Sequence, residues 1–241
     1  MKIPPKAYEN IDFLNSDACR PIRLQLEYLH PEVTMEEQGV KSTIVLFGSA
    51  RIPSQEKAEA CGNPKLAALA PYYEEARKLS RIVSSTCQID HECEYVVITG
   101  GGPGIMEAGN RGASEVDCKS IALNITLPHE QEPNPYVTPE LNFEFRYFHM
   151  RKMHFLSRAK ALVVFPGGFG TFDELFEALT LIQTGKIDQM PVILFGSKHW
   201  KRLIDWDYLA ECGVIAPKDL DLFTFCDTAE DAWETITNYY A

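Results

Sequence analysis

The sequence of 241 residues lacks a long apolar run, a cluster of basic residues, and closely paired cysteines. A membrane-spanning helix needs about 20 mostly apolar residues, so we expect no contact with a membrane. The chain carries 34 acidic and 23 basic residues, a net charge of −11, without a run of Lys and Arg. Binding to a nucleic-acid backbone requires a basic surface, and we therefore expect no nucleic-acid partner.

The cysteines are too scattered to form a recognisable framework. There are seven, an odd number, and no two of them are separated by only two residues. This pattern is typical of reduced thiols in a cytoplasmic protein, and it predicts no metal site. The first residues, Met-Lys-Ile-Pro-Pro-Lys, contain no apolar segment of the kind that a secretion signal has.

The usual nucleotide-cofactor motifs are also missing. After Gly102 and Gly104, Glu107 stands where the dinucleotide fingerprint requires a third small residue. The predicted strand 120–125 is not followed by the acidic residue that would hold a ribose diol, and no Walker A motif is present. We therefore expect no cofactor, and both nicotinamide chemistry and ATP hydrolysis are disfavoured.

What the chain does contain is an alternation of short apolar runs and amphipathic stretches. This pattern predicts an α/β protein with a Rossmann-like, doubly wound parallel sheet that has helices on both faces. The predicted strands are 43–47, 95–99, 120–125, 141–148, 161–165 and 192–195. The predicted helices are 65–86, 104–116, 149–158, 171–184, 198–211 and 228–240.

We expect a single nucleotide-binding domain over residues 1–241, because no linker, repeat or low-complexity segment interrupts the pattern. Residues 1–40 are predicted to form an N-terminal helical extension packed on this domain. Its short helix is expected to end before Pro31, since proline disrupts a helix interior. Four prolines within 126–140 predict a loop at the rim of a pocket.

Three of the predicted strands end in glycine-rich or small-residue turns. Strand 43–47 leads into Gly48-Ser49-Ala50-Arg51, strand 95–99 leads into Gly100–Gly104, and strand 161–165 leads into Pro166–Glu174. The carboxyl ends of parallel strands meet at one edge of a sheet, where ligands bind. Glycines allow backbone N–H groups to approach a phosphate, and a following helix adds its positive dipole. The sequence therefore predicts a phosphate site at this edge.

Glu174 has two interpretations that the sequence leaves open. Thr171-Phe172-Asp173-Glu174 matches a capping box, in which Thr171 caps a helix and Glu174 reaches back to its N–H. Alternatively, Glu174 contacts a ligand, and because a carboxylate repels phosphate it must then serve another part of that ligand. Arg151 is likewise either a surface residue or a functional one. Its position near a helix start is unfavourable for a cation, which slightly favours function.

Three residues beside the glycine-rich turns also have two interpretations each. Met106 is either core filler or a flank for a purine, and the helix dipole alone can explain Glu107. Arg51 is either a surface residue or a phosphate partner.

Four segments, in this order, resemble the LOG (LONELY GUY) family, which is often labelled lysine decarboxylase. They are Gly48–Arg51, Thr99–Ala108, Phe148–Met153 and Pro166–Glu174, the last matching the signature PGGxGTxxE. The resemblance runs from about residue 42 to residue 210. Phe148 and Glu107 depart from the shorter plant-like members, which have Met and Gly there, and residues 1–40 and the proline-rich loop resemble the longer bacterial-type branch.

The resemblance implies a nucleoside 5′-monophosphate phosphoribohydrolase, which cleaves AMP or an N6-modified AMP into the free base and ribose 5-phosphate. It implies that Arg151 and Glu174 are the catalytic pair, and it also implies a homodimer or a larger homo-oligomer. The candidate substrate-binding residues are Gly48, Ser49, Arg51, Gly101, Gly102, Gly104, Met106, Glu107, Pro166, Gly167, Gly168, Gly170 and Thr171.

Two other functions compete with this one. The first is a non-catalytic carrier of a nucleotide or cofactor with the same fold, against which the presence of both Arg151 and Glu174 argues. The second is a literal lysine decarboxylase, which would need a Schiff-base lysine for pyridoxal phosphate. No lysine of this sequence stands in a recognisable context for that chemistry.

Overall fold

A computed structural model describes residues 4–88, 93–126 and 132–241 of the chain. Its centre is a seven-stranded sheet in the order β4-β3-β2-β1-β5-β6-β7, and every neighbouring pair is parallel. The strands are β1 Thr43–Phe47, β2 Val96–Thr99, β3 Ser120–Ile125, β4 Asn142–Phe145, β5 Ala159–Val164, β6 Val192–Phe195 and β7 Thr224–Cys226. The predicted doubly wound α/β fold is confirmed.

The direction in which the chain adds successive strands to the sheet reverses between β1 and β5. From β1 the chain proceeds outward through β2, β3 and β4, whereas β5 lies on the other side of β1 and leads to β6 and β7. The loops that leave β1 and β5 therefore diverge, and such a switch point opens a crevice at the carboxyl edge of the sheet. The amide of Ser49 donates to the carbonyl of Pro166 at 3.0 Å, which ties the two loops together at the base of this crevice.

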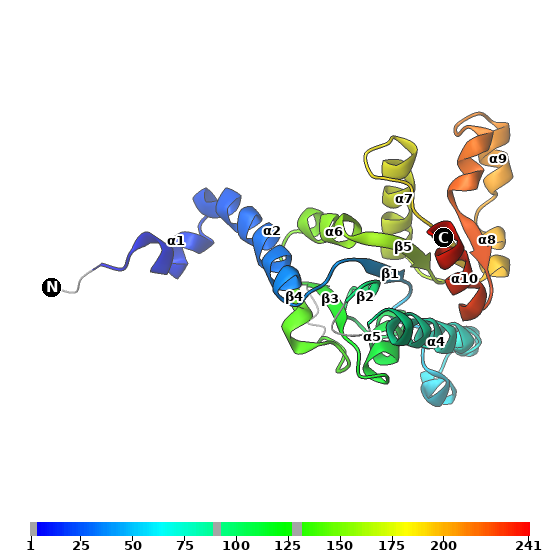
Figure 1. The fold of residues 1–241 in the computed structure, drawn as a ribbon, viewed down its shortest axis with the longest axis horizontal. Helices are drawn as coiled ribbons and strands as arrows, with labels where there is room; N and C mark the ends of the chain where they lie inside the picture. Colours follow the sequence, from blue (N-terminus) through cyan, green and yellow to red (C-terminus); the bar gives the residue numbers. More distant parts are fainter. Residues whose placement is uncertain (1–3, 89–92, 127–131) are drawn as a thin grey trace.

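Side chains alternate between the two faces of the sheet, and each face has its own core. In β1, Ile44 and Leu46 belong to one buried cluster and Val45 and Phe47 belong to the other. One cluster is covered by α4 Ala70–Cys87, α5 Ile105–Ser114 and α10 Ala229–Tyr239. The other is covered by α2 Arg20–Glu37, α6 Phe148–Ser157, α7 Phe169–Gln183, α8 Ser197–Leu203 and α9 Trp206–Glu211, and Figure 1 shows the two helical layers.

The prediction that the N-terminal helix ends before Pro31 is wrong, because α2 continues through this proline to Glu37. A proline inside a helix leaves the carbonyl four residues earlier without its N–H partner. Here that carbonyl belongs to Glu27, and the Nε2 atom of His154 donates to it at 3.0 Å. A buried side chain of α6 therefore replaces the missing hydrogen bond, which no local pattern in the sequence announces.

The segment before α2 leaves the body of the protein. The short helices Ala7–Glu9 and α1 Ile11–Asn15 bury none of their residues, and Figure 1 shows them extending away from the sheet. Further along, α2 buries Pro31 and Met35 against the domain. Within the part of the chain that the structure describes, no helix has the length and apolar character that crossing a membrane requires.

Other element boundaries differ from prediction where local chemistry interrupts a long pattern. The helix predicted over 65–86 is two helices, α3 Pro64–Ala67 and α4, and the one predicted over 198–211 is divided into α8 and α9. Asp205 begins α9 by accepting a hydrogen bond from the amide of Tyr208. Strand β4 is shorter than predicted, and the three-residue strand β7 was not predicted. Residues 127–131 of the proline-rich loop lie outside the described residues.

Candidate active site

A cavity of about 930 Å³ lies at the carboxyl ends of β1 and β5, where the chain direction reverses. Its lining brings together residues of three loops and of α5, α6, α7 and α8. The predicted site residues that line it are Gly48, Ser49, Arg51, Met106, Arg151, Pro166, Gly167, Gly168, Gly170, Thr171 and Glu174. Four predicted site residues are not part of this lining: Gly101, Gly102, Gly104 and Glu107.

The loop after β5 ends in the first turn of α7, which begins at Phe169 with Gly168 as its N-cap. Gly168 offers no side-chain cap, and its carbonyl accepts hydrogen bonds from the amides of Thr171 and Phe172. The first amides of a helix have no acceptor within it, and here those of Phe169 and Gly170 precede the first bonded one. This helix start therefore presents backbone donors and a positive dipole at the cavity.

The capping-box interpretation of Thr171 and Glu174 is wrong. Because α7 begins two residues earlier than predicted, Thr171 lies inside the first turn and its amide already donates to Gly168. Glu174 is six residues after the N-cap, in the second turn, where it cannot reach back to cap the helix. The position of this carboxyl group needs another explanation.

The glycines of this loop are of two kinds. A Cβ atom on Gly167 would lie 2.0 Å from Oγ1 of Thr171, so the fold itself requires glycine there. A Cβ atom on Gly168 or Gly170 would meet no described atom within 4 Å, and neither residue has a positive φ. Since the fold does not demand glycine at these two positions, the open space beside them is available to a ligand.

The glycines of the loop Gly100–Gly104, which follows β2, are required by the fold instead. Gly101 and Gly104 have φ values of 75° and 68°, which favour glycine. A Cβ atom on Gly104 would lie 2.3 Å from the carbonyl oxygen of Ser49, and one on Gly101 would lie 2.1 Å from Oδ1 of Asn124. These contacts allow the loops after β1 and β2 to pack closely, which explains why Gly101 and Gly104 are absent from the cavity lining.

A buried polar network behind this first loop was missed by the sequence reasoning. Asn110 is fully buried, and its Oδ1 atom accepts hydrogen bonds from Oγ1 of Thr99 and Nδ2 of Asn134. The same Nδ2 atom of Asn134 donates to the carbonyls of Gly101 and Gly102, at 3.0 and 3.2 Å. Asn134, which comes from the proline-rich loop, therefore fixes the position of the glycine loop. In the sequence, the signal for this network was Asn110, a polar residue beside the small residues Gly109 and Gly112 in the predicted helix 104–116.

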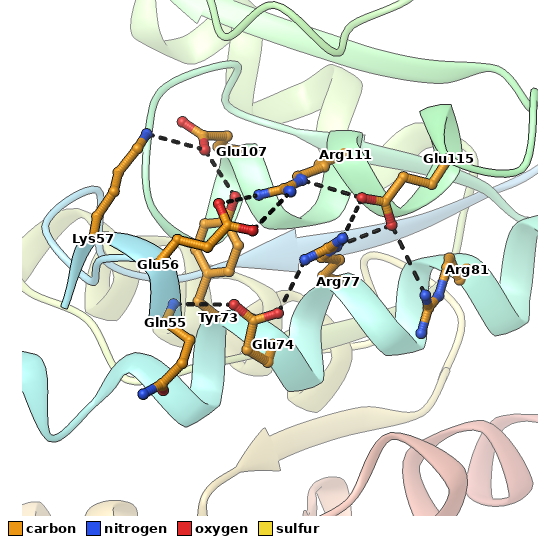
Figure 2. A network of polar contacts seen from close by, with 10 residues as sticks. All are labelled: Gln55, Glu56, Lys57, Tyr73, Glu74, Arg77, Arg81, Glu107, Arg111 and Glu115. Carbon is orange, nitrogen blue, oxygen red and sulfur yellow. Dashed lines mark hydrogen bonds and ion pairs between the residues drawn. The ribbon is translucent and has the colours of Figure 1, made fainter.

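Glu107 belongs to a different network, on the outer side of α4 and α5. Its carboxylate accepts a hydrogen bond from the hydroxyl of Tyr73 at 2.8 Å and lies 3.7 Å from Nζ of Lys57. Figure 2 shows Glu107 together with these partners and with the ion pairs around Arg111. Glu107 is thus engaged in joining helices and in holding the segment that follows β1.

Arg151 enters the cavity from α6 and lies over Gly100. A Cβ atom on Gly100 would be 2.5 Å from its Nη2 atom, so the missing side chain makes room for the guanidinium. The guanidinium also stacks near the ring of Phe155, 5.3 Å from its centroid. Its Nε atom is buried without a hydrogen-bond partner among the described residues. Burial lowers the pKa of Arg151, but an arginine stays charged, so an unsatisfied cation borders the cavity.

Glu174 is the buried carboxyl group of the site, with 8% of its surface exposed. Burial raises its pKa to about 7, because the charged form loses its hydration, and the nearby charges of Lys152 and Arg151 offset this only in part. A carboxyl group with a pKa near neutrality is suited to accept a proton during a reaction. Strongly perturbed groups of this kind gather at functional sites.

Lys152, next to Arg151 in the chain, joins α6, which carries Arg151, to α7, which carries Glu174. Its Nζ atom lies 2.8 Å from the carboxylate of Asp173 and 2.9 Å from that of Glu177. These acidic residues flank Glu174 on α7, so the ion pairs hold α6 against α7. Lys152 therefore fixes the relative positions of Arg151 and Glu174.

Four phenylalanines and one histidine also line the cavity. The most exposed of these phenylalanines are Phe148 and Phe169, which are 47% and 96% exposed, and the histidine is His199 from α8. Burial lowers the pKa of His199, and its Nε2 atom has no hydrogen-bond partner within the described part of the chain. His199 was missed because nothing in its local sequence indicates that α8 reaches the cavity.

The arrangement combines an anion cradle, a buried carboxyl group and a buried guanidinium around one cavity. Among the described residues, no lysine lines this cavity and no group of His, Cys, Asp and Glu is placed to hold a metal ion. The site therefore does not fit pyridoxal phosphate, which needs a lysine for its Schiff base. It fits a small phosphorylated molecule with a polar centre between the two charged side chains.

Comparisons with known proteins identify the family to which the chain is similar. The family model described as "Possible lysine decarboxylase" matches residues 106–236, more than half of the chain, including Arg151 and Glu174. The chain is 34% identical over 83 residues to a cytokinin riboside 5′-monophosphate phosphoribohydrolase of Mycobacterium tuberculosis, covering 34% of this chain and 44% of that protein. It is 28% identical over 92 residues to one of Arabidopsis thaliana, covering 38% and 43%. The matches thus span less than half the length of these two relatives.

A solved structure shows the same fold. The molybdenum cofactor binding protein of Rippkaea orientalis matches with a TM-score of 0.53 at 17% identity, over 83% of this chain and 98% of that one. At this identity the similarity concerns the architecture alone.

We predict that Glu174→Gln stabilises the protein at pH 8. A carboxyl group with a folded pKa above its unfolded value binds more protons in the folded state, so stability falls as the pH rises from about 4.5 to about 7. The neutral Gln avoids this loss and should raise the free energy of unfolding at pH 8 by about 1–3 kcal/mol. Urea denaturation at pH 5 and pH 8 measures the difference, which should be small at pH 5.

The control for this measurement is Glu211→Gln, an exposed position that does not line the cavity. It should show no such dependence on pH. A Glu174→Gln protein that is less stable than wild type at pH 8 would contradict the buried, destabilised carboxylate.

Proposed function

The chain belongs to the LOG family, which the possible lysine decarboxylase model describes, and we propose that it is a nucleoside 5′-monophosphate phosphoribohydrolase. The substrate is AMP or an N6-modified AMP such as a cytokinin riboside monophosphate, and the products are the free base and ribose 5-phosphate. The observation that carries the proposal is the buried carboxyl group of Glu174 in a cavity that also contains an open helix start and Arg151.

The phosphate binds at the start of α7 in this proposal. The backbone amides of Phe169 and Gly170, the open space beside Gly168 and Gly170, and the helix dipole all favour an anion there. Arg51 also lines the cavity and is available as a further partner of the phosphate. Binding of the phosphate positions the sugar over the interior of the cavity, where Glu174 lies.

Glu174 acts on the sugar. Cleavage of the glycosidic bond develops positive charge on the ribose ring, and a carboxylate stabilises this charge more in the transition state than in the ground state. With its pKa raised to about 7, Glu174 also accepts a proton from the water that attacks the anomeric carbon. This role explains why a carboxyl group is buried near a phosphate site at a cost in stability.

Arg151 acts on the leaving base. The departing base becomes electron-rich, and the unsatisfied guanidinium beside the cavity stabilises this negative charge. The apolar side chains of Met106 and Phe148, which line the same cavity, supply surfaces against which a purine ring can stack.

The competing carrier function rests on the shared fold alone, since the molybdenum cofactor binding protein is only 17% identical. A carrier of an anionic molecule gains nothing from a buried carboxyl group in its binding cavity, whereas a glycosidase needs one.

The free cysteines, seven in number, accord with a reducing compartment, and we propose that the enzyme is cytoplasmic.

We expect the purified protein to release the free base from AMP or from N6-isopentenyl AMP without added metal or nicotinamide. Adenosine should be a far poorer substrate, because it lacks the phosphate that the start of α7 holds. Chromatography of the bases released from AMP, GMP, CMP, N6-isopentenyl AMP and adenosine measures this. Measurable binding of the monophosphates without any released base would favour the carrier, and equal turnover of adenosine and AMP would refute the phosphate site.

Replacing either charged residue should abolish most of the activity without unfolding the protein. Glu174→Gln removes the charge that the transition state requires, and kcat should fall by about 100-fold or more. Arg151→Lys exchanges a planar donor for a point charge and should also be impaired. In wild type, kcat/KM should rise with pH up to about 7 as Glu174 ionises. Glu211→Gln serves again as the control, and near-normal turnover by Glu174→Gln would remove Glu174 from the mechanism.

Gly170→Ala tests the cradle separately from the chemistry. The added methyl group meets no described atom, and alanine is a better helix former, so the melting temperature should stay the same or rise slightly. The same methyl group would occupy space that the phosphate needs, and KM for AMP should increase by about 10-fold or more. Enzyme kinetics and thermal melts on the same preparation check both parts. An unchanged KM would show that the phosphate binds elsewhere.

A further inference from the structure

His199 of α8 has a buried nitrogen atom that the described residues leave without a partner. Its Nε2 atom is shielded from solvent and makes no hydrogen bond to them, although the side chain lines the cavity of the candidate active site. A buried polar atom without a partner destabilises a fold, so such atoms are usually paired in proteins. The roles proposed for Glu174 and Arg151 do not use this atom. Its place in the wall of the cavity indicates that a ligand contacts it.

The imidazole is held in place by the neighbouring Trp200. That indole is fully buried, and its Nε1 atom donates to the carbonyls of Val164 and Phe195, at 3.2 and 3.1 Å. These carbonyls end β5 and β6, so α8 is attached to the carboxyl edge of the sheet. Phe172, in the first turn of α7, also packs against the indole, with the ring centroids 5.4 Å apart. The ring of His199 lies edge-on to the indole at 5.8 Å, which places it near the start of α7.

The order of the strands separates His199 from Arg151. Arg151 lies over Gly100, directly after β2, whereas His199 is in the helix that follows β6. Strands β1 and β5 lie between β2 and β6, and the turn that begins α7 follows β5. The start of α7 is therefore between the two side chains. Since the base is assigned to the Arg151 end of the cavity, the part of a nucleotide that comes closest to His199 is the phosphate.

The imidazole is able to donate to an anion. Burial lowers its pKa, so the ring is neutral near pH 7 and carries a hydrogen on one nitrogen. With that hydrogen on Nε2, the ring can donate to a phosphate oxygen, and a hydrogen bond to a charged acceptor is stronger than one between neutral groups. The charged side chains of the same lining are Arg51, Arg151, Asp173 and Glu174. None of the acidic ones accepts a hydrogen bond from Nε2.

We propose that His199 binds the 5′-phosphate of the substrate through Nε2, as a side-chain donor beside the backbone amides at the start of α7. The inference rests on the proposed function, which assigns the phosphate to that helix start. The amides of Phe169 and Gly170 hold the phosphate from α7, and His199 holds it from α8. Contacts from two elements fix the orientation of the phosphate and of the sugar attached to it. The product ribose 5-phosphate uses the same contact.

Calorimetry with ribose 5-phosphate on the full chain tests the contact without any catalysis. His199→Ala should weaken the binding by about 10-fold or more, because a hydrogen bond to a charged group is lost. His199→Gln should restore most of the affinity, since the amide nitrogen of Gln can take the place of Nε2. The matched control is His30→Ala, an exposed histidine of α2 that does not line the cavity. It should bind ribose 5-phosphate as wild type does.

Kinetics and NMR spectroscopy separate this role from a structural one. With AMP, His199→Ala should raise KM by a similar factor and leave kcat nearly unchanged, because the lost contact is the same in the ground state and in the transition state. In protein labelled with ¹⁵N histidine, the Nε2 signal of His199 is identified by its loss in His199→Gln. This signal should shift when ribose 5-phosphate is added and stay in place when adenosine is added.

An unchanged affinity of folded His199→Ala for ribose 5-phosphate would overturn the proposal and leave the proposed reaction intact. So would an equal loss of affinity for adenosine and for AMP. If His199→Ala does not fold, the NMR signal of wild type decides: a signal that ribose 5-phosphate does not move contradicts the contact. A wild type that releases no base but binds ribose 5-phosphate through His199 would refute the proposed reaction alone, and one that binds neither ribose 5-phosphate nor AMP would overturn both.

Discussion

The close approach of the loops that follow β1 and β5 is the constraint on which the site depends. These two neighbouring strands are parallel, but the strands that follow β1 and those that follow β5 lie on opposite sides of the pair. A backbone hydrogen bond from Ser49 to Pro166 joins their loops at the base of the crevice. Glycine at position 104 lets the backbone of Ser49 and Ala50 pack against the start of α5. Once these backbones are fixed, α7 must begin at the crevice, and its first turn becomes a place for an anion.

The two charged side chains are then placed by packing rather than by pairing with each other. Arg151 fits over Gly100 and against Phe155, and Glu174 lies in the second turn of α7, where burial disfavours its ionised form. Lys152 locks the two helices together through Asp173 and Glu177. The protein thus keeps an unsatisfied guanidinium and a destabilised carboxyl group beside an empty volume, which costs stability and prepares both groups for a ligand.

The sequence was sufficient for strands β1 to β6 and for most of the residues around the cavity, because strand periodicity and glycine-rich turns are local signals. It was insufficient wherever a distant residue decided the outcome. His154 allows α2 to pass through Pro31, and this contact joins residues far apart in the chain. The match of Thr171 and Glu174 to a capping box was misleading, because Gly168 begins the helix earlier. Glu107 follows the loop Gly100–Gly104, but its carboxylate accepts a hydrogen bond from Tyr73. This contact depends on the packing of α4 against α5, which the local sequence does not indicate.

In the proposed mechanism, Glu174 faces the sugar of a nucleotide whose phosphate binds at the start of α7. A crystal structure of the Glu174→Gln variant with AMP tests it most directly, since the impaired variant should retain the intact substrate. We expect the phosphate at the amides of Phe169 and Gly170, the anomeric carbon beside residue 174, and the base near Arg151. A phosphate bound to Arg151, or a nucleotide that leaves residue 174 without contact to the ribose, would contradict it.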